Sequence, residues 1–206
     1  MKKFLVTLLM MLSVNCSAAT IDEVRLSAST SYPVIHVGDE AVDRKINTTI
    51  IEEVSKFFTD VQRTAKANDF EIGDVRVGYT VGSNEAGNTV ILSVVLIESS
   101  YFKGGAHPST YWRTLNFNTA NGELMTLEYL TEVGDGFRTG ELLSRLEAKL
   151  KEQCAREGLY LFDNALPLKE LPQDFYWDEN LHVHFVFQHY AIAPYAAGII
   201  DVDIDD

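Results

Sequence analysis

The strongest constraint on the fold is one long run of apolar residues at helical spacing near the start of the chain. Within residues 41–67, apolar side chains recur at three- and four-residue steps, at Val42, Ile46, Ile50, Val54, Phe57 and Val61. This spacing places them on one face of a helix of several turns. Because such a helix is stable mainly when another layer covers its apolar face, we expect a sheet beside it.

The segments that follow have the patterns of strands. Residues 74–81 alternate between apolar and polar, residues 89–97 are apolar on both faces, and residues 109–118 alternate again. Alternation is typical of a half-buried strand, whereas a continuous apolar run is typical of a central one. We therefore expect residues 89–97 in the middle of a sheet, with turns at 83–88 and 118–122.

The remaining segments complete an α+β layout. A second amphipathic helix is expected at residues 141–156, ended by Gly158. Helices and strands come in blocks rather than in strict alternation, which favours a mostly antiparallel sheet packed against two main helices. Further strands are expected at 24–32 (stopped by Pro33), 124–127, 181–190 and 198–204.

Residues 1–19 have the pattern of a secretory signal peptide. Lys2 and Lys3 precede an apolar run from residue 4 to residue 14, and small residues follow at 17–19. The run is shorter than the roughly 20 residues that a membrane-spanning helix needs, and no later segment approaches that length without a charge. We therefore expect cleavage near Ala19 and a periplasmic or secreted protein without a transmembrane segment.

The two cysteines qualify this expectation. Cys16 follows the apolar core and would carry a lipid in a lipoprotein, but Asn15 and Ser13 fit the lipoprotein signal poorly. Simple cleavage is therefore favoured over a lipid anchor. Cys154 would then have no partner for an internal disulfide, and we expect it to be a half-buried residue of the second helix.

The charge balance bears on possible partners. The chain has 17 basic and 30 acidic residues, and removal of Lys2 and Lys3 leaves 15 basic against 30 acidic. Such an acidic protein is a poor binder of nucleic acid or of an anionic membrane. It is compatible with a basic protein partner, because opposite charges speed encounter.

Few patterns in the chain point to catalysis. The nucleophile elbow, the Walker loop, the dinucleotide fingerprint and the HExxH motif are absent from the sequence. His182 and His184 would share one face of a strand and could both reach a metal ion, although His189 would lie on the other face. Asp201, Asp203 and Asp205 alternate with apolar residues along an expected strand. Their carboxylates could bind calcium, or they could simply form the solvent-facing side of that strand. The solvated interpretation is favoured for both groups, so we expect no metal, no cofactor and no catalytic residue.

Two loops are better candidates for function. Residues 103–108 contain a diglycine followed by histidine and proline, and residues 191–198 form a small-residue loop that carries one tyrosine. Loops held on a rigid sheet often bind partners, and tyrosine is a favoured anchor in protein interfaces. A tight connection between closely packed backbones would explain the small residues equally well.

At these loops the sequence resembles a known family. Residues 104–108, 115–118 and 122–127 resemble the first half of the RsiV-like domain, and residues 185–198 resemble its closing signature. The upstream strand, helix and strand of that family correspond in layout to residues 24–100. The resemblance implies one domain over residues 20–206, with an N-terminal part at 20–100 and a C-terminal signature part at 101–206.

The resemblance also implies a function. The family has an extracytoplasmic α+β domain without established catalytic residues; one member is the outer part of a membrane anti-sigma factor that binds lysozyme, and related domains accompany polysaccharide deacetylases. Because this sequence shows neither a transmembrane helix nor a deacetylase domain, we expect only the binding role to carry over. Ala191 stands where the family usually has an acidic residue, and His189 is atypical.

We therefore expect a non-catalytic binding protein whose partner is a basic protein such as lysozyme. Two alternatives remain: a peptidoglycan-binding module with Tyr111, Trp112 and Trp177 stacking on sugars, and an envelope hydrolase with a metal at His182 and His184. For the favoured function, the contact is expected on residues 103–110 and 188–198, through Gly104, Gly105, His107, Pro108, Gln188, Tyr190, Pro194 and Tyr195.

Overall fold

The computed structural model describes residues 19–83, 90–132 and 139–206, and the structural statements below concern these residues. The predicted signal peptide up to residue 18, with Cys16, and most of the predicted turn at 83–88 lie outside them. No helix among the described residues combines the length and the apolar character needed to cross a membrane. In chain order the elements are β1 (Thr20–Ser27), β2 (Thr30–His36), α1 (Glu40–Asn68), β3 (Ile72–Ser83), β4 (Ile91–Phe102), β5 (Ser109–Asn118), α2 (Leu127–Glu132), α3 (Thr139–Glu157), β6 (Phe175–Trp177), β7 (Val183–Phe187), the 3-10 helix η1 (Tyr195–Ala197) and β8 (Ile200–Asp203).

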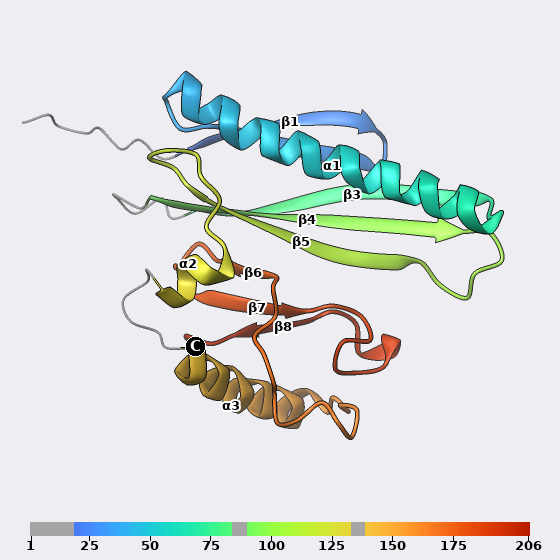
Figure 1. The fold of residues 1–206 in the computed structure, drawn as a ribbon, viewed down its shortest axis with the longest axis vertical. Coiled ribbons are helices and arrows are strands. Elements are labelled where there is room, and N and C mark those ends of the chain that lie inside the picture. The colour runs from blue at the N-terminus through green and yellow to red at the C-terminus, as the bar shows by residue number, and fades with distance from the viewer. Residues whose placement is uncertain (1–18, 84–89, 133–138) are drawn as a thin grey trace, which may run out of the picture.

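The larger of two sheets contains β1 to β5 in chain order (Figure 1). Its neighbouring strands are antiparallel, except that β2 and β3 meet in parallel through the single pair Thr30 and Val77. β4 pairs with β3 on one side and with β5 on the other, so the predicted central position of residues 89–97 is confirmed. The α+β fold is confirmed as well.

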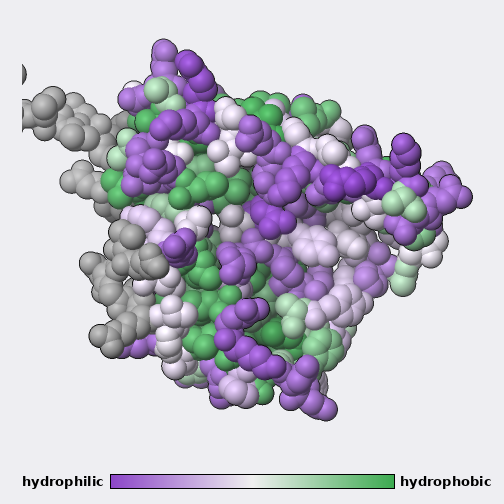
Figure 2. All heavy atoms as spheres, viewed as in Figure 1, coloured by the Kyte–Doolittle hydropathy of each residue, from purple (hydrophilic) through white to green (hydrophobic). Residues whose placement is uncertain are grey.

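Helix α1 covers one face of this sheet, as its apolar spacing predicts. Asp39 caps its start by accepting hydrogen bonds from the backbone N–H groups of Ala41 and Val42. The outer surface over α1 is mostly hydrophilic (Figure 2). Burial of the inner face supplies most of the helix's stability. The core between the two layers contains Ile35, Val42, Ile46, Ile50, Val54, Val77, Leu92, Val94, Leu96, Leu115 and Phe117.

The opposite face of the sheet receives strand β6 through polar contacts. Ser93 accepts a hydrogen bond from the backbone N–H of Trp177 at 3.0 Å, and the Asn116 amide donates to the carbonyl of Phe175 at 2.8 Å. A Cβ atom on Gly82 would lie 2.2 Å from the carbonyl oxygen of Trp177, so only glycine allows this approach. We call Gly82, Ser93 and Asn116, together with the β6 backbone that they contact, the inter-sheet seam.

Strands β6, β7 and β8 form the second sheet, and α3 packs beside it (Figure 1). Leu142, Leu146 and Leu150 of α3 are fully buried, which confirms the predicted helix. Gly158 ends it with a φ of 68°. Cys154 is half-buried, as expected. Together with Phe175, Phe185, Phe187, Val202 and Ile204, the leucines belong to a second apolar core.

The prediction that Pro33 stops a strand is wrong. β1 and β2 form a hairpin with its turn at residues 28–29, and Pro33 lies inside β2 opposite Glu23. Backbone N–H groups two residues apart in a strand point to the same side, so the nitrogen of Pro33 points the same way as the N–H of Ile35. The N–H of Ile35 points away from β1 and donates to Asn47 of α1 at 2.8 Å. Proline therefore costs the hairpin no hydrogen bond.

Three further predicted strands differ from the structure. β7 is shorter than the predicted 181–190 because Leu181 and Tyr190 have φ angles of 64° and 65°, which a strand does not contain. β8 is likewise shorter than 198–204. Residues 124–127 make only one bridge, from Leu124 to Phe117, before α2 begins.

Candidate functional site

The two loops singled out in the sequence meet in the structure. Tyr195, in η1, donates a hydrogen bond from its hydroxyl to the carbonyl of Pro108 at 3.0 Å. His107 Nε2 lies 3.1 Å from the hydroxyl of Tyr190. The loop between β4 and β5 and the segment after β7 therefore form one surface. We call His107, His189, Tyr190 and Tyr195 the aromatic cluster.

Stacking of rings holds this cluster together. The Tyr195 ring stacks on the imidazole of His107 with centroids 3.6 Å apart, and on that of His189 at 4.4 Å. The ring of Tyr190 lies 5.9 Å from that of Tyr195. Aromatic pairs at such distances contribute about 0.5–1.5 kcal/mol beyond their buried area. Tyr195 is thus the centre of the cluster, in contact with both loops.

The backbone places Tyr190 where it can meet a partner. Tyr190 adopts a left-handed conformation, with a φ of 65°, three residues after the end of β7. Its exposed fraction is 55%, whereas Tyr195 and His107 are half-buried. Pro194 is exposed and precedes η1. Tyr190 is therefore the exposed ring of the cluster, and Tyr195 lies behind it.

Hydrogen bonds determine the proton positions around His107. Its Nδ1 lies 2.9 Å from the carbonyl of Pro108, which can only accept, so Nδ1 carries a proton. In the neutral ring Nε2 then accepts a hydrogen bond from the Tyr190 hydroxyl. For His189, burial and the neighbouring His107 lower the pKa, which favours its neutral form. Its Nδ1 is buried without a hydrogen-bond partner.

The other predicted site residues have supporting positions. Gln188 donates from Nε2 to the Trp112 carbonyl at 2.7 Å and to Asp174 at 2.9 Å, and its Oε1 accepts from the Trp112 N–H at 3.1 Å. Its amide is therefore occupied in fixing the segment after β7 to β5. Gly104 has a φ of 86°, which allows the loop to turn, and the carbonyl of Gly105 accepts a hydrogen bond from Tyr101.

His182 and His184 do share a face, as predicted, but carboxylates of β8 face them. His182 Nδ1 lies 2.9 Å from Asp203, and His184 Nδ1 lies 3.1 Å from Asp201. The hydrogen bond to Asp203 raises the pKa of His182. Burial acts to lower the pKa of His184, but Asp201 and the neighbouring carboxylates outweigh it and raise the pKa. Within the described ranges, no group of three or more His, Cys, Asp and Glu residues is arranged to hold a metal ion.

The aromatic residues of the glycan alternative do not form one platform. Trp177 is only 7% exposed and packs edge-on against Phe175 in the second core. Tyr111 and Trp112 are adjacent in β5, so their side chains lie on opposite faces of the sheet. Tyr111 is 48% exposed and available to stack on a ligand, and Trp112 is half-buried. The prediction that Trp177 stacks on sugars is wrong, because its side chain is buried.

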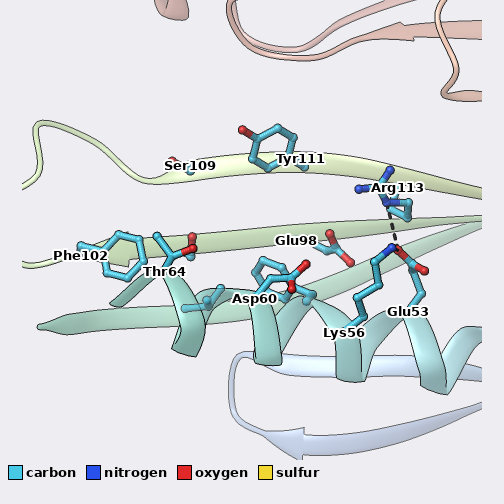
Figure 3. A pocket seen from close by; sticks show the side chains of 12 residues that line it. Glu53, Lys56, Asp60, Thr64, Glu98, Phe102, Ser109, Tyr111 and Arg113 are labelled. Carbon is cyan, nitrogen blue, oxygen red and sulfur yellow. Dashed lines mark hydrogen bonds and ion pairs between the residues drawn. The ribbon is translucent and has the colours of Figure 1, made fainter. Parts of the chain in front are cut away.

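The sequence interpretation also missed a groove between α1 and strands β4 and β5 (Figure 3). Its volume is about 310 Å³, and Tyr111 and Glu98 are among its lining residues. Glu98 follows the inward-facing Leu92, Val94 and Leu96 at strand spacing, which is the signal that marks an acidic residue on an apolar face.

Comparisons with known proteins identify two segments. A family model described as deacetylase PdaC matches residues 21–110, and one described as a protein of unknown function (DUF3298) matches residues 137–205. No curated protein matches the chain. The first match contains nearly all of β1 and the whole of β2, α1, β3 and β4, and the second contains α3 and β6 to β8 in full.

Solved structures of the DUF3298 family have a similar fold. One from Bacteroides fragilis is 15% identical, with a TM-score of 0.58, over 92% of this chain and 91% of that chain. Another from Pseudomonas aeruginosa PAO1 is 11% identical, with a TM-score of 0.59, over 92% of this chain and 88% of that chain. At these identities the likeness concerns the fold alone. Two segments of the chain are thus similar to the PdaC and DUF3298 family models, and the fold is similar to that of solved DUF3298 proteins.

Proposed function

We propose that this chain is an extracytoplasmic, non-catalytic binding protein whose contact surface is the aromatic cluster. The observation that carries the proposal is the position of Tyr195. Its ring stacks on both imidazoles of the cluster and its hydroxyl is bonded to Pro108, so Tyr190 is presented on a prearranged support. A rigid support reduces the ordering cost of binding, and an exposed tyrosine is a favoured anchor.

The partner in this proposal is a basic muramidase of the lysozyme type. The RsiV-like resemblance of residues 185–198 supports this choice, since that segment contains three of the four cluster residues. The net charge of −13 supports it as well. An acidic protein attracts a basic partner over a distance of about one Debye length, so the association should weaken as salt rises.

Calorimetric titration of the purified protein with lysozyme tests the proposal. The parent protein should bind, and Tyr190→Ala should weaken binding at least tenfold. Leu124→Ala is a matched control, because it also shortens an exposed apolar side chain (46%) but pairs with the opposite end of β5. Its affinity should equal that of the parent. Absence of binding by the parent, or equal losses in the two variants, would refute the proposal.

Peptidoglycan remains a second candidate ligand because Tyr111 is exposed beside the groove. Sedimentation with purified peptidoglycan separates the two functions. Stacking of a sugar on Tyr111 should survive high salt, whereas a steered protein complex should not. Tyr111→Ala should abolish sedimentation with the glycan and leave lysozyme binding unchanged.

The extracytoplasmic location is also part of the proposal, and mass spectrometry tests it. The intact mass of the exported protein should correspond to a chain that starts near Thr20, after the predicted cleavage at Ala19. A mass that includes Cys16 and a lipid would instead establish an anchored lipoprotein.

A further inference from the structure

The groove between α1 and strands β4 and β5 contains a carboxyl group with an unused hydrogen-bonding atom. Glu98 is 4% exposed, and its Oε1 has no hydrogen-bond partner. Figure 3 shows its carboxyl directed into the space between the sheet and the helix. A buried polar atom without a partner is rare and costs free energy. Because Glu98 lines a groove of about 310 Å³, a bound molecule could donate a hydrogen bond to its carboxyl group.

The basic residues around the groove are paired with other acids. Arg113 Nε lies 3.4 Å from Glu53, and Lys56 Nζ lies 2.9 Å from the same carboxylate. Arg113 also lies 3.9 Å from Asp174. Neither base forms an ion pair with Glu98. The groove therefore contains two bases whose charges are compensated, and two buried side-chain atoms without a hydrogen-bond partner, Glu98 Oε1 and Arg113 Nε.

The chemistry of these groups selects the class of ligand. An anion would be repelled by Glu53, Asp60 and an ionised Glu98. A neutral alcohol would supply a donor but no charge. A primary ammonium group supplies both, since it has three N–H donors and a positive charge. The walls of the groove include Phe57 and Phe102, and Tyr111 lies at its edge, which gives the carbon frame of such a molecule apolar surface to contact.

We propose that this groove binds a small molecule through a primary ammonium group that donates a hydrogen bond to Glu98. The amine of a sugar and the alkylamine of a lysine-like chain share this chemistry, and Tyr111 distinguishes them. A sugar ring would stack on the ring of Tyr111, whereas an alkylamine has no ring to stack there.

Binding of an amine is linked to ionisation of Glu98. Burial raises the pKa of Glu98 to about 7; Arg113 and Lys56 act to lower it, while Glu53 and Asp174 act to raise it. Asp60 of α1 and Tyr111 of β5 also line the groove. An ammonium group binds the ionised form of Glu98, so affinity should rise about tenfold between pH 6 and pH 8, in proportion to the ionised fraction.

Titrations followed by NMR test this inference with four probes. Glucosamine and n-butylamine carry the ammonium group at low pH, although part of the glucosamine is uncharged at pH 8 and its free concentration must be corrected. N-acetylglucosamine and n-butanol are the matched neutral probes. We expect saturable binding of at least one amine and at least tenfold weaker binding of its neutral counterpart. Equal binding of an amine and its counterpart, or no saturable binding of either amine, would overturn the inference.

Glu98→Gln tests the role of the carboxyl group itself. This variant keeps the shape of the side chain, so it should weaken amine binding at least tenfold at pH 8 and remove the pH dependence. Unchanged affinity in the variant would overturn the inference. The parent protein offers an independent measurement, because a bound amine should lower the pKa at which the Glu98 side-chain carbon signal titrates. A loss of binding by Tyr111→Ala with glucosamine, but not with butylamine, would assign the sugar source.

Discussion

The ring of Tyr195 lies against the imidazole of His107 with their centroids 3.6 Å apart, although the two residues come from separate loops. The same tyrosine bonds to the carbonyl of Pro108 through its hydroxyl. These two contacts unite the loop between β4 and β5 with the segment after β7. The residue that organises the candidate binding surface is therefore the half-buried Tyr195, and Tyr190 is the exposed residue proposed to contact the partner.

Removal of the Tyr195 ring should disrupt the whole cluster. Tyr195→Ala loses both stacking contacts and should weaken lysozyme binding by about 2 kcal/mol or more, as for a binding hot spot. Tyr195→Phe keeps the stacking and loses only the hydrogen bond to Pro108, so its effect should be about 1 kcal/mol or less. Calorimetry measures both, with circular dichroism to check the fold. Equal losses for Ala and Phe would assign the effect to the hydroxyl instead.

Glu98 should lower the stability of the protein at high pH. Its pKa rises from an ordinary 4.5 to about 7 in the folded protein. The stability associated with the protonated form is fully present below pH 4.5 and is lost as pH rises through about 7. The free energy of unfolding should fall by about 3 kcal/mol over this range. Glu98→Gln should therefore be about 3 kcal/mol more stable than the parent at pH 8, and nearly equal to it at pH 4. Urea unfolding at both pH values measures the difference, and a constant difference would contradict this account.

The pair of His184 and Asp201 should give the opposite kind of variant effect. The folded-state pKa of His184 is raised, so the stability from its charged form is present below about pH 6.5, its usual value, and is lost as pH rises through the folded pKa. His184→Gln should cost about 1.5–3 kcal/mol more at pH 5.5 than at pH 8, the range of a hydrogen bond to a charged group. Urea unfolding at the two pH values tests this expectation. The His184 ring also stacks on that of Tyr176 with centroids 4.7 Å apart, and a cost independent of pH would show that this packing dominates.

Two glycines of β3 provide a matched test of the inter-sheet seam. Gly82→Ala places a Cβ atom 2.2 Å from the carbonyl oxygen of Trp177, so β6 must move; we expect a loss of about 2 kcal/mol or more. Gly78 is four residues earlier on the same face, and a Cβ atom there meets nothing within 4 Å. Gly78→Ala should therefore leave stability nearly unchanged. Thermal unfolding of the two variants measures the contrast, which should vanish if β6 does not dock on this face.

The sequence predicted those parts of the fold that depend on periodicity. α1, α3, β4 and β5 carry clear apolar patterns, because each buries one face or two against a core. Strand β6 was missed because it is three residues long and its backbone is held by distant side chains such as Ser93 and Asn116. No local pattern records a contact of that kind.

The candidate site was predicted only in part, because the sequence shows local composition but not contacts between distant segments. The loop composition indicated that residues 103–108 and 191–198 were candidates, and the structure brings them together. Which tyrosine is exposed and which is half-buried depends on how the two loops meet. The spacing of residues along the chain does not predict that arrangement. Glu98 had a visible signal at an inward strand position, but its lack of a partner depends on Arg113 and Lys56 pairing with Glu53.

The inter-sheet seam has a consequence for how this chain can vary. Ser93 and Asn116 recognise main-chain atoms of β6, which every residue except proline presents alike. The side chains of Phe175 and Trp177 point into the second core, so their identities are chosen by that core alone. Substitutions of Phe175 or Trp177 therefore require no matching change at Ser93 or Asn116. The side chains of β6 can vary with the second core while these two hydrogen bonds across the seam stay the same.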